Sequence, residues 1–111
     1  MRRVKTGSFM SRLIEQLDKI ETEMKFIGYW FDADLEGTDK AFEHWLQFKF
    51  LPQARRRIAD NDLPKDSQVG LAAMRQYDYH SYVPEAQNLF ALLSEFDELV
   101  REHAGTQRTY R

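Results

Sequence analysis

The stretch AFEHWLQFKFLP, residues 41–52, predicts the centre of the fold. At 3.6 residues per turn its apolar side chains cover more than half of a helix surface, and a helix that is apolar on most sides lies inside a domain. We therefore expect a central helix over about residues 39–50, with Thr38 and Asp39 capping its N-terminus. Its aromatic side chains are expected to lie mostly in the core: Phe42, Trp45, Phe48 and Phe50.

Pro52 interrupts this apolar run. Proline has no backbone N–H and its ring clashes with the preceding turn, so it breaks or kinks a helix, although it fits the first turn of a new one. A second helical segment is therefore expected over about residues 52–60. The residues from Asp60 to Pro64 have the composition of a loop that ends this segment.

The residues before this centre predict a long amphipathic helix. Apolar side chains recur at helical spacing and form one stripe: Met10, Leu13, Ile14, Leu17, Ile20, Met24 and Ile27. Charged residues occupy the opposite face, as expected for a helix that packs on a core by one side. We place this helix at about residues 9–28, where Gly28 suits the turn that follows a helix.

A third helix is predicted at about residues 66–76, with Asp66 or Ser67 as its cap. Small residues around Gly70 would permit a neighbouring helix to approach closely. The residues that follow, Tyr77–Val83, are rich in aromatic side chains and are expected to form an irregular link.

The last helix is predicted to start at Pro84 and to reach about His103, because proline is favoured in the first turn of a helix. Gly105 is expected to stop it. No segment alternates with the period of a β-strand for long. Together these patterns predict an all-α, compact, four-helix bundle-like domain with a proline break after the second helix.

The chain has 111 residues, of which 42% are hydrophobic, enough for one domain with its own core. We divide it into a flexible lead at residues 1–8, a single helical domain at residues 9–104 and a polar tail at residues 105–111. There is no cysteine, which excludes disulfides and thiolate metal sites. No segment is long and apolar enough to span a membrane. A soluble, cytoplasmic protein is therefore expected.

No motif for catalysis, a cofactor or a metal ion is recognisable. None of the three histidines follows a glutamate by three residues, as a di-iron bundle would require, and no phosphate-binding glycine loop occurs. His44 is expected to face solvent, and His103 to lie at the end of the last helix. The sequence therefore favours a protein that is not an enzyme. A site built from His80 and a distant carboxylate remains an open alternative.

Arg55, Arg56 and Arg57 form the densest basic run. Consecutive residues of a helix point about 100° apart, so the three guanidinium groups fan out and do not form one patch. The simplest interpretation is a solvated surface helix. The alternative is a contact with RNA or with an acidic partner, in which aromatic side chains would stack on bases.

Two aromatic groups lie in predicted connections. They are Trp30 and Phe31 after the first helix, and Tyr77, Tyr79 and Tyr82 with His80 before the last one. Aromatic side chains in loops either cover the ends of a core or form a contact surface. We treat these six residues as the candidate binding residues for a protein partner.

The block from Phe42 to Pro52 resembles the signature of the YqcC-like family of small bacterial proteins. Gly28-Tyr29-Trp30 before it, Leu63-Pro64 after it and the leucine-rich final helix agree with this resemblance. The resemblance implies a compact four-helix protein of the bacterial cytoplasm, with no assigned activity and no catalytic residues. The stretch between Trp30 and Phe42 is shorter than the family pattern, so a contact made there by relatives would be altered here.

Taken together, the sequence favours a non-enzymatic protein-interaction or adaptor module. Its partner is an unidentified protein, and self-association into a two-fold homodimer is one form of this hypothesis. An RNA-associated accessory protein is the alternative. Neither hypothesis involves a cofactor.

Overall fold

The computed structural model describes residues 8–32, 41–79 and 82–108. The first helix, α1 (Ser8–Phe26), forms where the apolar stripe predicted it. Leu13, Leu17, Ile20 and Met24 are fully buried along one side of it. Burial of each of these side chains contributes roughly 2 kcal/mol.

The predicted turn at Gly28 is confirmed. This residue has a φ of 83°, a conformation that glycine adopts without steric cost. The N–H of Tyr29 donates to the carbonyl oxygen of Met24 at 2.7 Å, and the N–H of Gly28 donates to that of Lys25 at 3.2 Å. These two bonds satisfy carbonyl groups at the end of the helix, so the chain leaves α1 in a fixed direction.

The central helix is a continuous run of three elements: α2 (Phe42–Trp45), the π-helical segment η1 (Leu46–Phe50) and α3 (Leu51–Ala59). The discontinuity expected at Pro52 takes the form of η1, which ends two residues before the proline. Pro52 itself lies in the first turn of α3, where its missing N–H costs little. The predicted cap at Thr38 and Asp39 lies outside the described residues.

The last part of the chain forms α4 (Val69–Met74), the π-helical segment η2 (Arg75–Tyr79), the short 3-10 helix η3 (Pro84–Ala86) and α5 (Gln87–Arg108). Two predicted boundaries are wrong. The expected link at Tyr77–Val83 is helical as far as Tyr79, because η2 extends α4. The expected stop at Gly105 is absent, since glycine inside a helix costs only about 1 kcal/mol and does not by itself end it.

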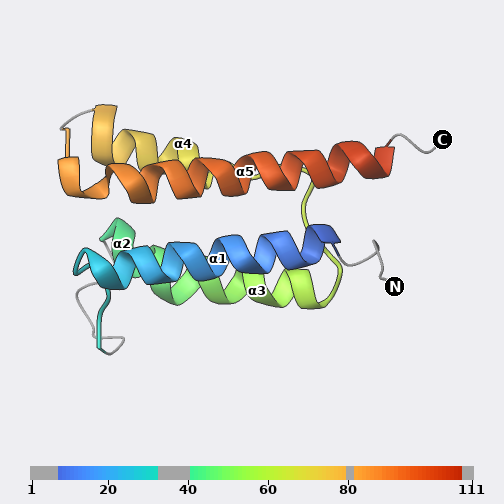
Figure 1. Ribbon diagram of the computed structural model, residues 1–111, viewed down its shortest axis with the longest axis horizontal. Helices are drawn as coiled ribbons and strands as arrows, with labels where there is room; N and C mark the ends of the chain where they lie inside the picture. The colour runs from blue at the N-terminus through green and yellow to red at the C-terminus, as the bar shows by residue number, and fades with distance from the viewer. Residues whose placement is uncertain (1–7, 33–40, 80–81, 109–111) are drawn as a thin grey trace.

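The elements group into four helical segments, and no strand occurs among the described residues, so the predicted all-α four-helix class is confirmed. Figure 1 shows α1 and α5 side by side and antiparallel, with α4 beside α5 and α3 beside α1. The molecule measures 45 × 28 × 23 Å. None of the described helices has the length and apolar character needed to cross a membrane.

Gly70 permits α4 to lie close against α5, as predicted from the small residues around this position. A Cβ atom at this position would come within 2.7 Å of the Ser94 Cα, which is part of the α5 backbone. No larger residue fits here without displacing one of the two helices. The short distance also brings the first N–H groups of α4 next to side chains of α5.

Candidate interaction surface

A continuous row of aromatic rings fills the space between the central helix and the α4–α5 pair. Its rings contact one another in this order: Tyr29, Tyr77, Phe42, Trp45, Phe50 and Phe96. Neighbouring ring centroids lie between 5.4 and 6.1 Å apart, within the range of favourable aromatic pairs. The aromatic residues of the central helix are thus used mainly for packing, as predicted, although Trp45 remains 40% exposed.

The π-helical segment η1 explains how Trp45 and Phe50 come to touch. In an α-helix, residues five apart point about 140° away from each other. A π-helix closes its hydrogen bonds between residues five apart, so such residues lie nearly above one another. The two ring centroids are 5.7 Å apart. The sequence pattern did not predict this contact, because the prediction assumed an α-helix with 3.6 residues per turn.

The segment after α1 is fastened to η1 by one side chain. The Gln47 amide donates to the carbonyl oxygen of Phe31 at 2.9 Å, and its oxygen accepts from the N–H of Phe31 at 2.8 Å. The Phe31 ring then lies over His44 and Phe48. The prediction that His44 faces solvent is therefore wrong, because this segment covers it and leaves only 2% exposed.

The structure distributes the six predicted partner-binding residues over different environments. Tyr82 is 65% exposed, whereas Trp30 and Phe31 are partly buried. Tyr79 lies in η2 and its side chain is not described, and His80 lies outside the described residues.

Tyr77 corrects the prediction for its own position, because it is a core residue with only 2% exposed. Its hydroxyl donates to Glu43 Oε2 at 2.6 Å and joins η2 to α2. Burial, together with the neighbouring Glu43 carboxylate, raises the pKa of the Tyr77 hydroxyl far above its usual value of 10. The ring is thus fixed inside the domain and offers no contact surface.

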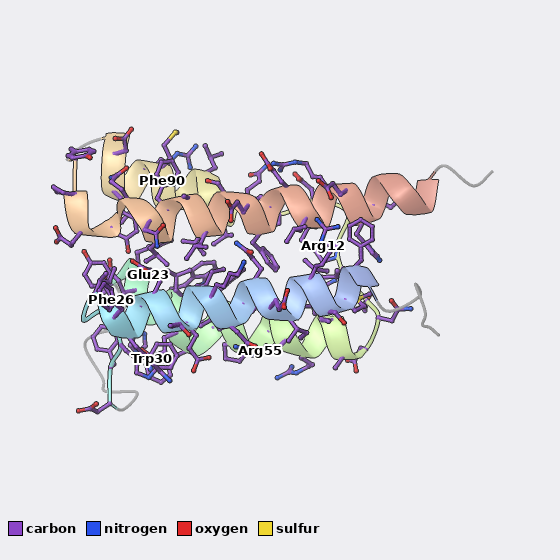
Figure 2. All side chains as sticks on the ribbon, in the orientation of Figure 1. Arg12, Glu23, Phe26, Trp30, Arg55 and Phe90 are labelled. Carbon is purple, nitrogen blue, oxygen red and sulfur yellow. The ribbon has the colours of Figure 1, made fainter. Side chains whose placement is uncertain are left out.

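Among the described residues, the most exposed large apolar side chain is one that the sequence analysis did not predict. Phe26, at the end of α1, is 82% exposed. It lies two residues after Met24, so it points away from the apolar stripe, and a large apolar residue on the polar face was the signal that could have revealed it. Figure 2 shows Phe26 and Trp30 at the same end of the molecule, opposite to Arg12.

Tyr82 lies at this end as well, because it is two residues before η3, which leads into the start of α5, and α5 runs antiparallel to α1 (Figure 1). A hydrogen bond of 3.3 Å from the Tyr29 hydroxyl to Glu85 joins the two segments there. We call Phe26, Trp30 and Tyr82 the aromatic end face. Phe26 and Tyr82 are exposed, and Trp30 is partly buried. Exposed apolar side chains at one end of a molecule are typical of interaction sites, whereas scattered ones are common on any surface.

The three consecutive arginines do not form a basic patch. Arg55 is placed 3.0 Å from both Asp18 and Glu21 of α1. The Arg57 side chain donates to the carbonyl oxygen of Asp62 at 2.9 Å. The predicted fanning is therefore observed, and two of the three guanidinium groups bind acceptors within the protein.

Asp97 is a buried carboxylate and deserves comparison with a catalytic group. It accepts hydrogen bonds from Ser67 Oγ at 2.5 Å and from the N–H groups of Val69 and Gly70 at 3.1 and 2.7 Å. Burial raises its pKa, while these hydrogen bonds oppose the increase. Because both oxygens are occupied by donors of the protein, Asp97 acts here as the cap of α4.

This arrangement corrects the predicted cap of the third helix. Neither Asp66 nor Ser67 caps it from its own chain segment, since the helix begins at Val69 and its free N–H groups bind Asp97 of α5. Asp66 instead binds Arg101 at 3.1 Å, which lowers the pKa of the Asp66 carboxyl.

The cavities of the described part of the chain are shallow. One of about 160 Å³ lies between α3, the connection to α4 and α5, and Phe50, Leu63, Pro64 and Phe96 contribute apolar lining. Among the described residues no group of three or more His, Asp or Glu side chains could hold a metal ion. The pairing of His80 with a carboxylate lies outside the described residues and stays a prediction.

The chain belongs to the family DUF446, whose model carries the description tRNA pseudouridine synthase C and matches residues 12–99. The matched region includes most of α1, the central helix, α4 and the first part of α5. Neither the comparison with curated proteins nor the comparison with solved structures gives a match. The family match does not test the resemblance to the YqcC-like family, which stays a prediction.

Proposed function

We propose that this member of the DUF446 family is a non-enzymatic interaction module that binds another protein through its aromatic end face. The observation that carries the proposal is the exposure of Phe26, at 82%, on the same end of the molecule as Trp30. Tyr82, which is 65% exposed, precedes η3 and α5 at that end. Transfer of such side chains from water into an interface is favourable by roughly 25 cal/mol per Å² of apolar surface. Aromatic residues are also enriched at the centres of protein interfaces.

The environment of the polar groups supports an interaction role over catalysis. The buried carboxylate of Asp97 and the buried hydroxyl of Tyr77 both bind groups of the protein itself. A catalytic acid or base needs a free position within hydrogen-bonding distance of a substrate. A role in the bacterial cytoplasm, as in the YqcC-like resemblance, is part of the same proposal.

The family description suggests the process in which such a module would act. It names an enzyme that modifies tRNA, and an accessory protein of such an enzyme would bind the enzyme, the tRNA or both. We favour contact with a protein, because Arg55 and Arg57 are already bound to acidic or carbonyl groups of the domain. Direct RNA contact is the second candidate, supported by the family description.

Affinity capture from a bacterial extract tests the interaction. The wild-type protein is compared with the double variant Phe26→Ser, Tyr82→Ser and with the control Leu71→Ser, which removes a 39% exposed apolar side chain of α4. We expect the wild type and the control to retain the same protein and the double variant to lose it. Equal retention by all three would refute the role of the aromatic end face.

Two further measurements separate the alternatives. Light scattering of the purified protein shows whether the captured partner is a second copy of this chain, which would form a homodimer. Titration with tRNA at low and moderate salt tests direct RNA contact, since binding to phosphates weakens steeply as salt increases. Salt-sensitive RNA binding that the charge reversal Arg56→Glu abolishes would favour the second candidate.

A further inference from the structure

The aromatic end face is surrounded mainly by acidic side chains. The elements that meet at this end of the molecule are the end of α1, the start of α2, η2 and η3 (Figure 1). Their described charged residues, with those of the segment after α1, are Glu23, Asp32, Glu43, Asp78 and Glu85, against Lys25 and Arg75. The formal net charge of the whole chain is only −2, so this region is more acidic than the average of the molecule.

The acidic character continues along the face formed by α1 and α5. Two adjoining shallow furrows lie there, of about 290 and 490 Å³. Their charged lining residues are Arg12, Glu15, Asp18, Lys19, Glu23, Glu95, Glu98 and Glu102. Glu23 lines the larger of the two furrows and lies one turn before Phe26 in α1, so the acidic lining reaches the end of the helix that carries the aromatic end face (Figure 2).

The acids of the furrows are only partly offset, although Arg55 lies 3.0 Å from Asp18. Outside this pair and the Arg12–Glu102 pair, the furrow lining has four acidic residues and one lysine: Glu15, Glu23, Glu95 and Glu98, against Lys19. Lys25 binds Glu21 at 3.0 Å and lies over the Trp30 ring, with its Nζ 4.9 Å from the centroid. Arg12 lies 3.6 Å from Glu102. The remaining negative potential favours positively charged partners and repels phosphate groups.

We infer that the segment bound by the aromatic end face is a basic one: a stretch of a partner protein with lysine or arginine side chains around an apolar residue. The apolar residue contacts Phe26, and the basic side chains face Glu23 and the acids of the α1–α5 furrows. This inference rests on the proposed interaction function and adds the chemistry of the partner. A protein that binds nucleic acid carries basic surface of this kind.

The two kinds of contact have separable effects on binding. Contact with Phe26 excludes water and determines mainly how slowly the complex dissociates. The exposed charges act through long-range attraction, which accelerates association and is screened within about 8 Å at physiological ionic strength. Binding should therefore depend on salt, and a change of either kind should weaken it independently.

The test uses fluorescein-labelled synthetic peptides and the full-length protein. One peptide contains lysine and leucine, a second has glutamate in place of lysine, a third has serine in place of leucine, and oligouridylate RNA is the fourth probe. We expect the lysine–leucine peptide to bind most tightly and to weaken about tenfold with Phe26→Ser, but not with Leu71→Ser. A glutamate–leucine peptide or RNA that binds as tightly would overturn the inference.

Charge reversal gives the second arm. Glu23→Lys with Asp78→Lys places positive charge beside the aromatic end face. Asp60→Lys with Asp62→Lys makes a charge change of the same size in the exposed residues just after α3, away from that face. Only the first pair should weaken the binding of the lysine–leucine peptide and strengthen the binding of the glutamate–leucine peptide. Equal effects of both changes would refute local charge recognition.

The same variants separate failure of the inference from failure of the proposed function. If the partner captured from the extract depends on Phe26 and Tyr82 but not on Glu23 and Asp78, the interaction function stands and the basic chemistry of the partner is refuted. If capture does not depend on Phe26 and Tyr82, both fall together.

Discussion

The junction between α4 and α5 buries a polar group and satisfies all its hydrogen bonds, whereas the aromatic end face leaves an apolar side chain exposed. At the junction, the buried carboxylate of Asp97 is fully bound by Ser67 and the first N–H groups of α4, and Gly70 provides the necessary space. At the end face, Phe26 remains in contact with water. The difference is that the buried polar group is satisfied within the protein, whereas the exposed ring of Phe26 has no such cover, and the proposed binding role rests on this difference.

The replacement Asp97→Ala should have the largest effect on stability. It leaves the N–H groups of Val69 and Gly70 without their acceptor in a buried place, so we expect the free energy of unfolding to fall by about 3 kcal/mol. Urea denaturation measures the change. Asp97→Asn retains one acceptor oxygen and should cost less, and equal losses for both variants would contradict the capping role.

Gly70→Ala should have the next largest effect, and Gly105→Ala is its matched control. The added methyl group at position 70 would lie 2.7 Å from Ser94 Cα, so we expect a loss of about 2 kcal/mol. At position 105 it would meet no described atom within 4 Å, so improved helix propensity should add up to about 1 kcal/mol. Thermal unfolding of both variants gives the comparison, and effects of the same sign would refute it.

Glu21 tests the contribution of the ion pairs that it forms with Lys25 of α1 and with Arg55 of α3. The hydrogen bond from Lys25, and a second one from Arg55, hold the pKa of Glu21 below 4.5. Because the folded pKa is below the unfolded one, the stabilisation is present above pH 4.5 and is lost as the pH falls through the folded pKa.

Glu21→Gln should therefore make the loss of stability below pH 4.5 less steep and should cost less than about 1 kcal/mol at neutral pH. Urea denaturation at a series of pH values measures both. An unchanged dependence on pH would show that these partly exposed ion pairs do not stabilise the fold.

Phe26→Ser should have the smallest effect on stability. The side chain makes little buried contact, so we expect the free energy of unfolding to change by no more than about 0.5 kcal/mol. The same variant should lose its partner in the capture experiment. A large loss of stability would place Phe26 among the structural residues and remove the distinction between the two regions.

The candidate surface was only partly predictable. Trp30 and Tyr82 are predicted contact residues because they lie in connections, where aromatic side chains either cover the core or form contacts. Local sequence cannot distinguish the two roles. Tyr77 is a core cover because η2 carries it back onto α2. The exposure of Phe26 was not predicted, because this residue lies neither in the apolar stripe of α1 nor in a loop.

Amino-acid order was enough to predict the number and approximate positions of the helices, because apolar stripes and turn residues act within a few residues of one another. The stripe of α1 and the turn at Gly28 are of this kind. Only the tertiary structure decided the cap of α4, the burial of His44 and the row of aromatic rings. Each of these depends on groups far apart in the chain or on a π-helical turn. A hydrogen bond or a ring contact forms only at a particular distance and orientation of two groups, and residue order does not specify either.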